Sequence, residues 1–334
     1  MSTGAGGLPA GAGGTDLAAL LRAAAARLAT AGVPSPRADA EQLLAHVLGR
    51  PRAAVVTAAL RGDAGPDEGA RRVLAGLVAR RARREPLQHL TGTAGFRGLE
   101  LRVGPGVFVP RPETELVAGA AVAAAQEVQA RAGRPAVVVD LCTGSGAIAL
   151  AVAAEVPAAR VVGVELEEDA LVWARRNAGA QGSSAGRPGG PVEVVAGDAA
   201  TALPGLEGAV DVVVSNPPYV PPGATPVDPE VRDHDPAPAL YGGGPDGLAV
   251  PRAVLARAAA LLRPGGVLLV EHADVQQDAL LAALAAGPWE DARGHADLTG
   301  RPRWVRALRA DGADRAGAAA PADAGPRPCH DATS

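Results

Sequence analysis

The sequence predicts an α/β protein in which a doubly wound, mostly parallel sheet follows a small helical domain and a β-hairpin linker. Three observations support this fold class. Apolar residues recur at helical spacing near the N-terminus, strand-like and helix-like patterns alternate through the rest of the chain, and a glycine-rich turn joins the first parallel strand to a helix. Alternation of this kind is typical of sheets whose two faces are both covered by helices.

The composition limits the chemistry that the chain can perform. The chain has 334 residues, a formal net charge of −4 and a pI near 5.9, and all of its 32 basic residues are arginine. Without lysine, neither a P-loop nor a lysine nucleophile can form. The acidic balance, with three Trp, two Tyr and two Phe, does not favour a nucleic-acid binder. We therefore expect no specific DNA binding.

The cysteines and the absence of targeting segments indicate a cellular location, and composition indicates disorder at the two ends of the chain. Cys142 and Cys329 lack the paired spacing of a disulfide framework or a zinc site, so we expect a reducing, cytoplasmic location and no metal. Neither a secretory signal nor an apolar run of membrane-spanning length is visible, and we expect no membrane partner. Residues 1–14 and 311–334 are poor in large apolar side chains and are expected to be a disordered leader and tail.

The helical domain is expected over residues 15–85. Helical periodicity covers residues 17–28, 38–48 and 67–84, and the last stretch should present Val73, Leu74 and Leu77 on one buried face. It ends in the arginine-rich run 80–84. Such a run is typical of a solvated helix end, although contact with an acidic partner or an RNA backbone stays open.

The linker is expected over residues 86–110. Residues 99–103 and 107–109 alternate as strands do, and Gly104-Pro105-Gly106 between them predicts the turn of a hairpin. After it, Arg111-Pro112-Glu113-Thr114-Glu115 favours a helix start, because proline suits the first turn and carboxylates suit the positive end of the helix dipole.

The second domain, residues 111–310, alternates strands with helices. Candidate strands cover five segments: 136–139, 160–164, 192–195, 210–214 and 267–271. Residues 182–191 are rich in Gly, Ser and Pro and are expected to form a surface loop without chemistry.

A ligand site is predicted where the first of these strands ends. Asp140-Leu141-Cys142-Thr143-Gly144-Ser145-Gly146 leads into a helix near Ala147, and the amino end of that helix favours an anionic group. Glu165, after the second strand, stands where a ribose-binding carboxylate is expected. Because the string also fits Gly-x-Gly-x-x-Ala through Ala149, a nicotinamide dehydrogenase remains an alternative at this point.

Two further strand ends add to this site. Asp198, in the turn Gly197-Asp198-Ala199, could accept a hydrogen bond from an adenine amino group. Asn216-Pro217-Pro218-Tyr219 follows the fourth strand, and its prolines make a stiff turn whose carbonyls and Asn216 side chain stay free for a substrate. An amide or amino-purine nitrogen must be oriented by acceptors before it can attack, so the tetrad predicts methyl transfer to a planar nitrogen, with the Tyr219 ring against the planar group.

These blocks together resemble the bacterial release-factor glutamine methyltransferases. The similarity extends over about residues 16–309 and includes the linker sequences Pro86 to Gly92 and Pro110 to Glu115, the block Pro236 to Leu240 followed by Gly244 to Leu248, and Asp297 to Arg303. The resemblance implies a seven-stranded, Rossmann-like class I methyltransferase sheet. It also implies S-adenosylmethionine as methyl donor and, as acceptor, the N5 nitrogen of the Gly-Gly-Gln glutamine in peptide chain release factors 1 and 2, recognised by the helical domain.

The resemblance also assigns roles to residues of this chain. Asn216 and Pro217 would be catalytic, and the substrate would be bound by Asn216, Pro217, Pro218 and Tyr219. The cofactor would be bound by Cys142, Thr143, Gly144, Ser145, Gly146, Glu165, Asp198, Ala199 and Asn216. The family often has Gly in place of Cys142, Asp in place of Glu165 and an aromatic residue near Ala199.

Three other functions stay open from the sequence. A ribosomal-protein glutamine methyltransferase shares the motifs, and an adenine-N6 DNA methyltransferase uses the same tetrad, although it usually adds a basic recognition domain. A cofactor-sensing protein without activity is the third alternative.

Overall fold

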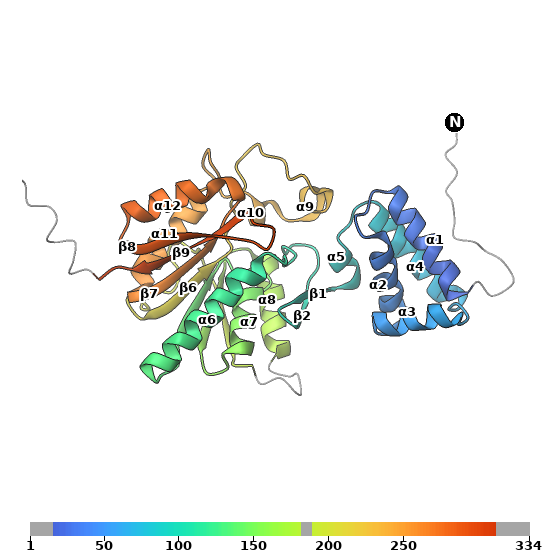
Figure 1. Cartoon of the computed structure of the whole chain (residues 1–334), viewed down its shortest axis with the longest axis horizontal. Coiled ribbons are helices and arrows are strands. Elements are labelled where there is room, and N and C mark those ends of the chain that lie inside the picture. The colour runs from blue at the N-terminus through green and yellow to red at the C-terminus, as the bar shows by residue number, and fades with distance from the viewer. Residues whose placement is uncertain (1–15, 182–188, 312–334) are drawn as a thin grey trace, which may run out of the picture.

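The computed structural model describes residues 16–181 and 189–311 as a helical unit joined to a sheet domain by a short hairpin (Figure 1). The predicted disordered leader 1–14, most of the predicted loop 182–191 and nearly all of the predicted tail 311–334 lie outside the described residues. The boundaries that we placed between the domains stay predictions.

The helical unit packs its helices around one apolar core. The helices are α1 (Leu17–Thr30), α2 (Pro36–Leu48), α3 (Arg52–Arg61), α4 (Glu68–Ala82) and the short α5 (Leu87–Thr91). The Asp67 carboxylate caps α4 by accepting from the Ala70 amide at 2.8 Å, and Gly49 and Gly62 end α2 and α3 with φ of 58° and 74°.

Two details of this unit differ from the sequence prediction. Helix α3 was not predicted, because Val55 is its one large buried side chain and Leu60 is 82% exposed, so its apolar periodicity is weak. Val73 was placed on the buried face of α4, but it is 56% exposed, and Val78 lies in the core with Leu74 and Leu77 instead.

The hairpin is real, but we predicted the wrong pairing. Strand β2 (Leu99–Arg102) pairs antiparallel with β1 (Thr93–Phe96), which precedes it, rather than with residues 107–109. The turn is Arg97-Gly98, whose φ values of 45° and 72° match the twist of a two-residue hairpin. Val107 and Val109 bury their side chains against Ala94 and Val103 without joining a strand.

The sheet domain has the predicted fold class. Its strands are β3 (Val137–Leu141), β4 (Arg160–Glu165), β5 (Val192–Ala196), β6 (Val210–Ser215), β7 (Leu262–Glu271), β8 (Trp289–Ala296) and β9 (Pro302–Arg309). Their spatial order is β5-β4-β3-β6-β7-β9-β8. The first five strands pair in parallel, and β9 is antiparallel to both of its neighbours, β7 and β8. The sequence located the five parallel strands to within a few residues, whereas β8 and β9 followed only from the family resemblance.

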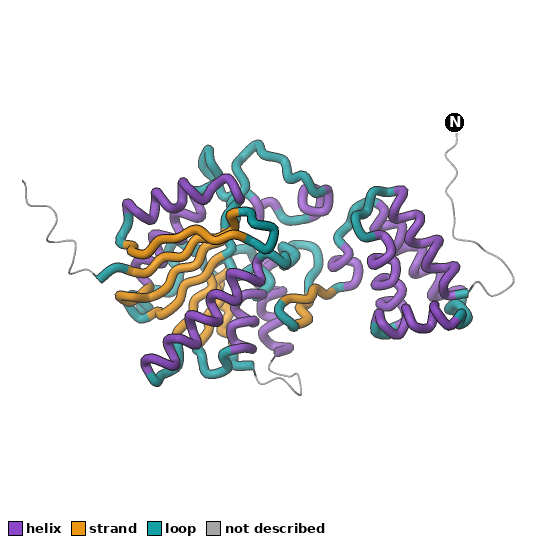
Figure 2. Tube along the Cα trace, in the orientation of Figure 1, coloured by secondary structure: helices purple, strands orange, loops and turns teal. Residues whose placement is uncertain are grey.

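Helices cover both faces of this sheet (Figure 2). One face carries α6 (Thr114–Ala132), α7 (Ala147–Glu155) and α8 (Glu168–Gln181), and the other carries α11 (Ala249–Leu261) and α12 (Gln277–Ala286). Neighbouring strand residues alternate between the two cores: Val138 packs with α6 and α7, and Val139 packs with α11. Continuous apolar strands are therefore required, as the sequence has them.

A partly buried ion cluster joins the helical unit to the sheet domain. Glu230, in the short helix α9 (Pro229–His234), accepts from Arg81 at 2.8 Å and from Arg84 at 2.6 Å, while Arg81 also binds Asp39 of α2 at 2.7 Å. Figure 1 shows α9 on the side of the sheet domain that faces α2 and α4. The arginine run is thus not simply a solvated helix end, because two of its members bind the other domain.

Within the described residues, no single helix is both long enough and apolar enough to cross a membrane. The pair α2 and α3 satisfies length and composition only when taken together, and it bends by 101° at the break.

Candidate functional site

The carboxyl ends of four parallel strands meet at one cavity of about 970 Å³. Strand β3 lies between β4 and β6. The chain adds β4 and β5 on one side of β3, and it then crosses over to add β6 on the other side. Ligands of doubly wound sheets bind at this reversal. The cavity is lined by nearly all of the predicted site residues: Cys142, Thr143, Gly144, Ser145, Glu165, Asp198, Ala199, Asn216, Pro217, Pro218 and Tyr219.

Gly146 does not line the cavity, but it shapes the turn that does. It precedes α7 with a φ of 84°, and a Cβ at this position would lie 3.0 Å from the Leu150 side chain. Cys142 also has a positive φ, 61°. The left-handed region favours glycine, which accounts for the glycine that the family often has here. Burial raises the pKa of the Cys142 thiol, so it stays protonated.

Asp140 stabilises the turn between β3 and α7 through its side-chain hydrogen bonds. Its Oδ2 accepts from the Thr143 hydroxyl at 2.6 Å and from the Ala149 amide at 3.1 Å, while Oδ1 has no partner among the described residues. Complete burial raises the pKa of Asp140 to about 7. The Thr143 amide also donates to the Val164 carbonyl of β4 at 2.9 Å, so the turn is tied to two strands.

Glu165 accepts backbone hydrogen bonds from the turn after β3 and from the two residues that follow it in the chain. Oε2 accepts from Gly144 at 2.7 Å, and Oε1 accepts from Leu166 at 2.9 Å and Glu167 at 3.0 Å. Burial raises the pKa of Glu165, and these three amides act against the rise. A carboxylate offers about four acceptor directions, so one on Oε2 remains for a ligand hydroxyl.

Asp198 and Ala199 form the cavity wall after β5. Oδ1 of the exposed Asp198 accepts from the Ala200 amide at 2.8 Å, which closes a local turn, and its other oxygen has no hydrogen bond among the described residues. Ala199 is buried. The structure thus brings both to the cavity, and part of the Asp198 carboxylate is used in its own turn.

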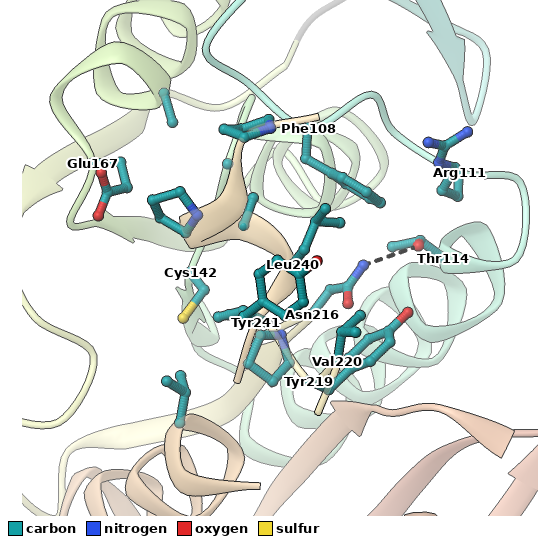
Figure 3. A pocket seen from close by; sticks show the side chains of 18 of the residues that line it. Phe108, Arg111, Thr114, Cys142, Glu167, Asn216, Tyr219, Val220, Leu240 and Tyr241 are labelled. Carbon is teal, nitrogen blue, oxygen red and sulfur yellow. Dashed lines mark hydrogen bonds between the residues drawn. The ribbon is translucent and has the colours of Figure 1, made fainter. Parts of the chain in front are cut away.

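The Asn-Pro-Pro-Tyr turn after β6 also lines the cavity, and Figure 3 labels two of its residues, Asn216 and Tyr219. We expected its carbonyls and the Asn216 side chain to be free, and this is only partly correct. Asn216 Nδ2 donates to the Thr114 hydroxyl at 3.2 Å, whereas Oδ1 accepts from none of the residues that the structure describes. The Tyr219 carbonyl accepts from Gln276 at 2.7 Å. Among the described residues none donates to the Pro217 carbonyl.

A segment that the sequence analysis left without a role holds this turn in place. The Leu240 carbonyl accepts from the Tyr219 amide at 3.1 Å and from the Val220 amide at 2.7 Å. Gly242 and Gly247 approach so closely that a Cβ on either would overlap the backbone of residues 218–221. The glycine-rich sequence Tyr-Gly-Gly-Gly-Pro-Asp-Gly was the available signal, since close backbone approach requires glycine.

Gln276 completes this support from the other side. Its Nε2 bridges the Tyr219 carbonyl and the Asp246 carbonyl, at 2.7 and 2.9 Å, while its Oε1 accepts from the Ala273 amide at 3.0 Å. No motif in the sequence indicated this buried glutamine.

The outer wall of the cavity comes from residues 221–236 and the linker. Arg111 binds Asp235 at 2.8 Å and lies over the Phe108 ring, 5.0 Å from its centroid. Burial raises the pKa of Asp235 to about 6, against the nearby Arg111 charge. Through Arg111, the linker is therefore connected to residues 221–236, the segment that also contains Glu230.

No set of three or more His, Cys, Asp or Glu side chains in residues 16–181 and 189–311 is arranged to hold a metal ion.

Comparison with known protein families gives two matches along the chain. Residues 19–92 match the PrmC N-terminal domain, and residues 100–228 match the methyltransferase small domain.

Three curated relatives cover much of the chain. A release factor glutamine methyltransferase of Streptomyces coelicolor is 52% identical, over 85% of this chain and 95% of the relative, and one of Mycolicibacterium smegmatis is 51% identical, over 88% and 98%. A 4-amino-L-phenylalanine/4-methylamino-L-phenylalanine methyltransferase of Streptomyces pristinaespiralis is 45% identical over 64% of this chain and 70% of the relative.

The close approach at Gly242 can be tested by substitution. Gly242→Ala should destabilise the sheet domain by about 1–3 kcal/mol, because the added methyl group overlaps the backbone of Pro218 and Gly247. Tryptophan fluorescence during urea unfolding measures this, since Trp173, Trp289 and Trp304 all lie in that domain.

Gly179→Ala is the matched control, since nothing lies within 4 Å of a Cβ at that exposed helix position. It should leave stability unchanged or raise it by up to about 1 kcal/mol. Equal urea midpoints for the two variants would show that the glycine segment does not support the turn.

Proposed function

The chain belongs to the release factor glutamine methyltransferases, S-adenosylmethionine-dependent enzymes that methylate protein glutamine, and on this premise we propose that its acceptor is the Gly-Gly-Gln glutamine of peptide chain release factors 1 and 2. The methyl group would be added to the N5 nitrogen of the glutamine side chain. The cytoplasm, where translation terminates, is the proposed location.

The observation that carries this proposal is the pair of free acceptors on the turn after β6. No described residue donates to Asn216 Oδ1 or to the Pro217 carbonyl, although the neighbouring backbone groups of Tyr219 and Val220 are all bound. A primary carboxamide has two N–H donors on one flat nitrogen. Two adjacent acceptors on a rigid turn match that group.

The residues on the opposite wall fit the methyl donor. The free acceptor direction on Glu165 suits a ribose hydroxyl, and the first amides of α7 suit the carboxylate of a methionine group. A cavity of about 970 Å³ is large for one drug-sized ligand, so a donor and an acceptor side chain can share it. Cys142 to Gly146, Asp198 and Ala199 would line the donor.

The reaction requires alignment of the donor methyl group with the acceptor nitrogen more than it requires a strong base. The donor supplies a methyl group that its sulfonium already activates. Asn216 and Pro217 would orient the acceptor nitrogen, and the cavity wall would exclude water from it. As positive charge grows on that nitrogen, its N–H groups become stronger donors to both oxygens, so these hydrogen bonds stabilise the transition state more than the ground state. After methyl transfer, the cationic nitrogen would lose its spare proton to water.

The helical unit distinguishes the candidate acceptors. The PrmC N-terminal domain match covers this unit, which supports a protein acceptor read by two domains. Three of the four arginines in its run are paired with carboxylates, Arg80 with Glu85 and both Arg81 and Arg84 with Glu230, which does not favour a nucleic-acid acceptor. The Streptomyces pristinaespiralis relative acts on an arylamine, which is also a planar nitrogen, so that compound belongs in the assay.

Mass spectrometry after reaction tests the proposal. The protein is incubated with S-adenosylmethionine and, separately, a release factor, ribosomal protein, DNA or 4-amino-L-phenylalanine. We expect one added methyl group on the Gly-Gly-Gln glutamine and none on a release factor whose motif glutamine is changed to alanine. Methylation of another acceptor, with the release factor unchanged, would overturn the proposal.

Asn216→Ala tests the acceptor pair. Removing one preorganised hydrogen-bond partner of the reacting group should lower kcat by about 10²–10³-fold, because the amide nitrogen loses its orientation and its charge stabilisation. Calorimetry should give a dissociation constant for S-adenosylmethionine within a few-fold of wild type. Turnover like that of wild type would remove the proposed mechanism.

Glu165→Ala tests the donor wall. The variant loses the ribose acceptor and the carboxylate that ties Gly144 to residues 166 and 167, so donor affinity should fall about tenfold or more while kcat at saturation changes little.

Glu168→Ala is the control for this variant, because Glu168 belongs to the same acidic cluster but is exposed and does not line the cavity. A Glu165→Ala protein that binds the donor as tightly as the Glu168→Ala protein would contradict the assignment.

A further inference from the structure

A buried asparagine on α8 has no role in the function proposed above, although it binds the turn between β3 and α7. Asn177 is 4% exposed and does not line the cavity. Its carboxamide forms three hydrogen bonds, all to backbone atoms of two other segments. A buried polar side chain costs stability unless it is bonded, so these partners account for an asparagine in the interior.

Two of these bonds hold the backbone of the linker strand β2. Asn177 Oδ1 accepts from the Arg102 amide at 2.8 Å, and Nδ2 donates to the Arg102 carbonyl at 3.0 Å. A residue of a neighbouring antiparallel strand would exchange the same two bonds with Arg102. Asn177 therefore acts as a strand partner on the edge of β2 that faces α8, and Figure 1 shows these two elements next to each other.

The third bond reaches the turn that we assign to the methyl donor. Asn177 Nδ2 also donates to the Ser145 carbonyl at 2.9 Å. The Gly146 amide belongs to the same peptide group, and it donates to the Thr143 carbonyl at 2.9 Å. Both ends of this peptide group are thus bound, so its plane cannot rotate without breaking a hydrogen bond. Because Ser145 lines the cavity, Asn177 helps to fix the shape of the cavity wall.

The backbone partners determine which way the Asn177 carboxamide points. Its NH₂ group meets two carbonyls, whereas its oxygen meets an amide N–H. Rotating the carboxamide by half a turn would oppose its oxygen to both carbonyls and its NH₂ to the Arg102 amide. Backbone groups cannot exchange donor for acceptor character, so this position requires a side chain with both a donor and an acceptor.

A second residue on the same face of α8 also binds the linker. Trp173 precedes Asn177 by four residues, which places both on one side of the helix. Its Nε1 donates to the Pro105 carbonyl at 3.2 Å, and a Cβ on Gly104 would lie 2.6 Å from its ring. Of these two linker contacts, the one at Asn177 continues to the turn between β3 and α7.

We propose that Asn177 is a positioning residue that ties the donor-binding turn to linker strand β2, so that affinity for S-adenosylmethionine depends on its hydrogen bonds. This inference rests on the donor wall proposed above. The linker strands follow α5 directly, so the segment held by Asn177 is also the one that attaches the helical unit. Coupling between two sites is reciprocal, and a bound donor must therefore stabilise β2 in turn.

Asn177→Leu tests this role in the full-length protein. Leucine is similar in size but loses all three hydrogen bonds, so the Ser145 carbonyl is no longer held. Calorimetry should give a dissociation constant for S-adenosylmethionine about tenfold above that of wild type. With saturating donor and a release factor as acceptor, kcat should change by less than about threefold, since donor binding is weakened equally in the ground and transition states.

Asn177→Ala is a second variant for the case that the leucine variant does not fold. Its smaller side chain leaves space for water beside the Arg102 amide, which lowers the cost of the unpaired backbone groups. The same rise in the donor dissociation constant is expected.

Trp173→Phe is the matched control. It removes one hydrogen bond between the same helix face and the linker, keeps an aromatic ring, and leaves the Ser145 carbonyl bound to Asn177. Its dissociation constant for S-adenosylmethionine should stay within about twofold of wild type. Asn177 variants that bind the donor as tightly as Trp173→Phe would overturn the proposal.

Hydrogen exchange read by mass spectrometry measures the coupling itself. Saturating S-adenosylmethionine should slow exchange of the amides of residues 99–103 in wild type and should have no such effect in Asn177→Leu. A purely structural role would speed exchange in the variant without removing its response to the donor. An equal response in both proteins would contradict the coupling.

The Glu165→Ala variant separates a failure of this inference from a failure of the proposed donor wall. If Glu165→Ala weakens donor binding and Asn177→Leu does not, the inference is wrong and the donor wall stands. If neither variant weakens donor binding, the donor wall itself is misplaced and the inference falls with it.

Discussion

The site depends on one constraint, the fixed conformation of the turn that follows β6. Two prolines set its φ angles, the Leu240 carbonyl binds two of its amides, and Gln276 binds the Tyr219 carbonyl. Asn216 Oδ1 and the Pro217 carbonyl receive no hydrogen bond from the described part of the chain, so the site can offer them to a ligand. Because the supporting groups come from distant parts of the chain, the turn is rigid only in the complete fold.

The parallel part of the fold could be predicted from the sequence for a physical reason. Buried parallel strands must be apolar on both faces, and runs such as Val212 to Val214 show this directly. Strand β8 could not be found in this way, because most of its residues are exposed, polar ones such as Glu290 and Asp291 among them, and only Trp289 is buried. The hairpin was mispaired because Gly104-Pro105-Gly106 looked like a stronger turn than Arg97-Gly98, which requires a positive φ at an arginine.

The site was predictable where a motif follows a strand. Cys142, Glu165, Asp198 and Asn216 all reach one cavity, because parallel strands end at one edge of the sheet. Their supporting partners were not predictable. Thr114 lies 102 residues from Asn216 in sequence, and nothing in a local pattern indicates such a contact. Hydrogen bonds formed by tertiary packing need the fold before they can be inferred.

A crystal structure with S-adenosylhomocysteine and a Gly-Gly-Gln peptide tests the central claim most directly. The account predicts that the glutamine side-chain nitrogen lies within about 2.7–3.2 Å of both Asn216 Oδ1 and the Pro217 carbonyl, with Asn216 Nδ2 still on Thr114. A peptide glutamine bound away from the Asn-Pro-Pro-Tyr turn, or an Asn216 whose nitrogen faces it, would contradict the account.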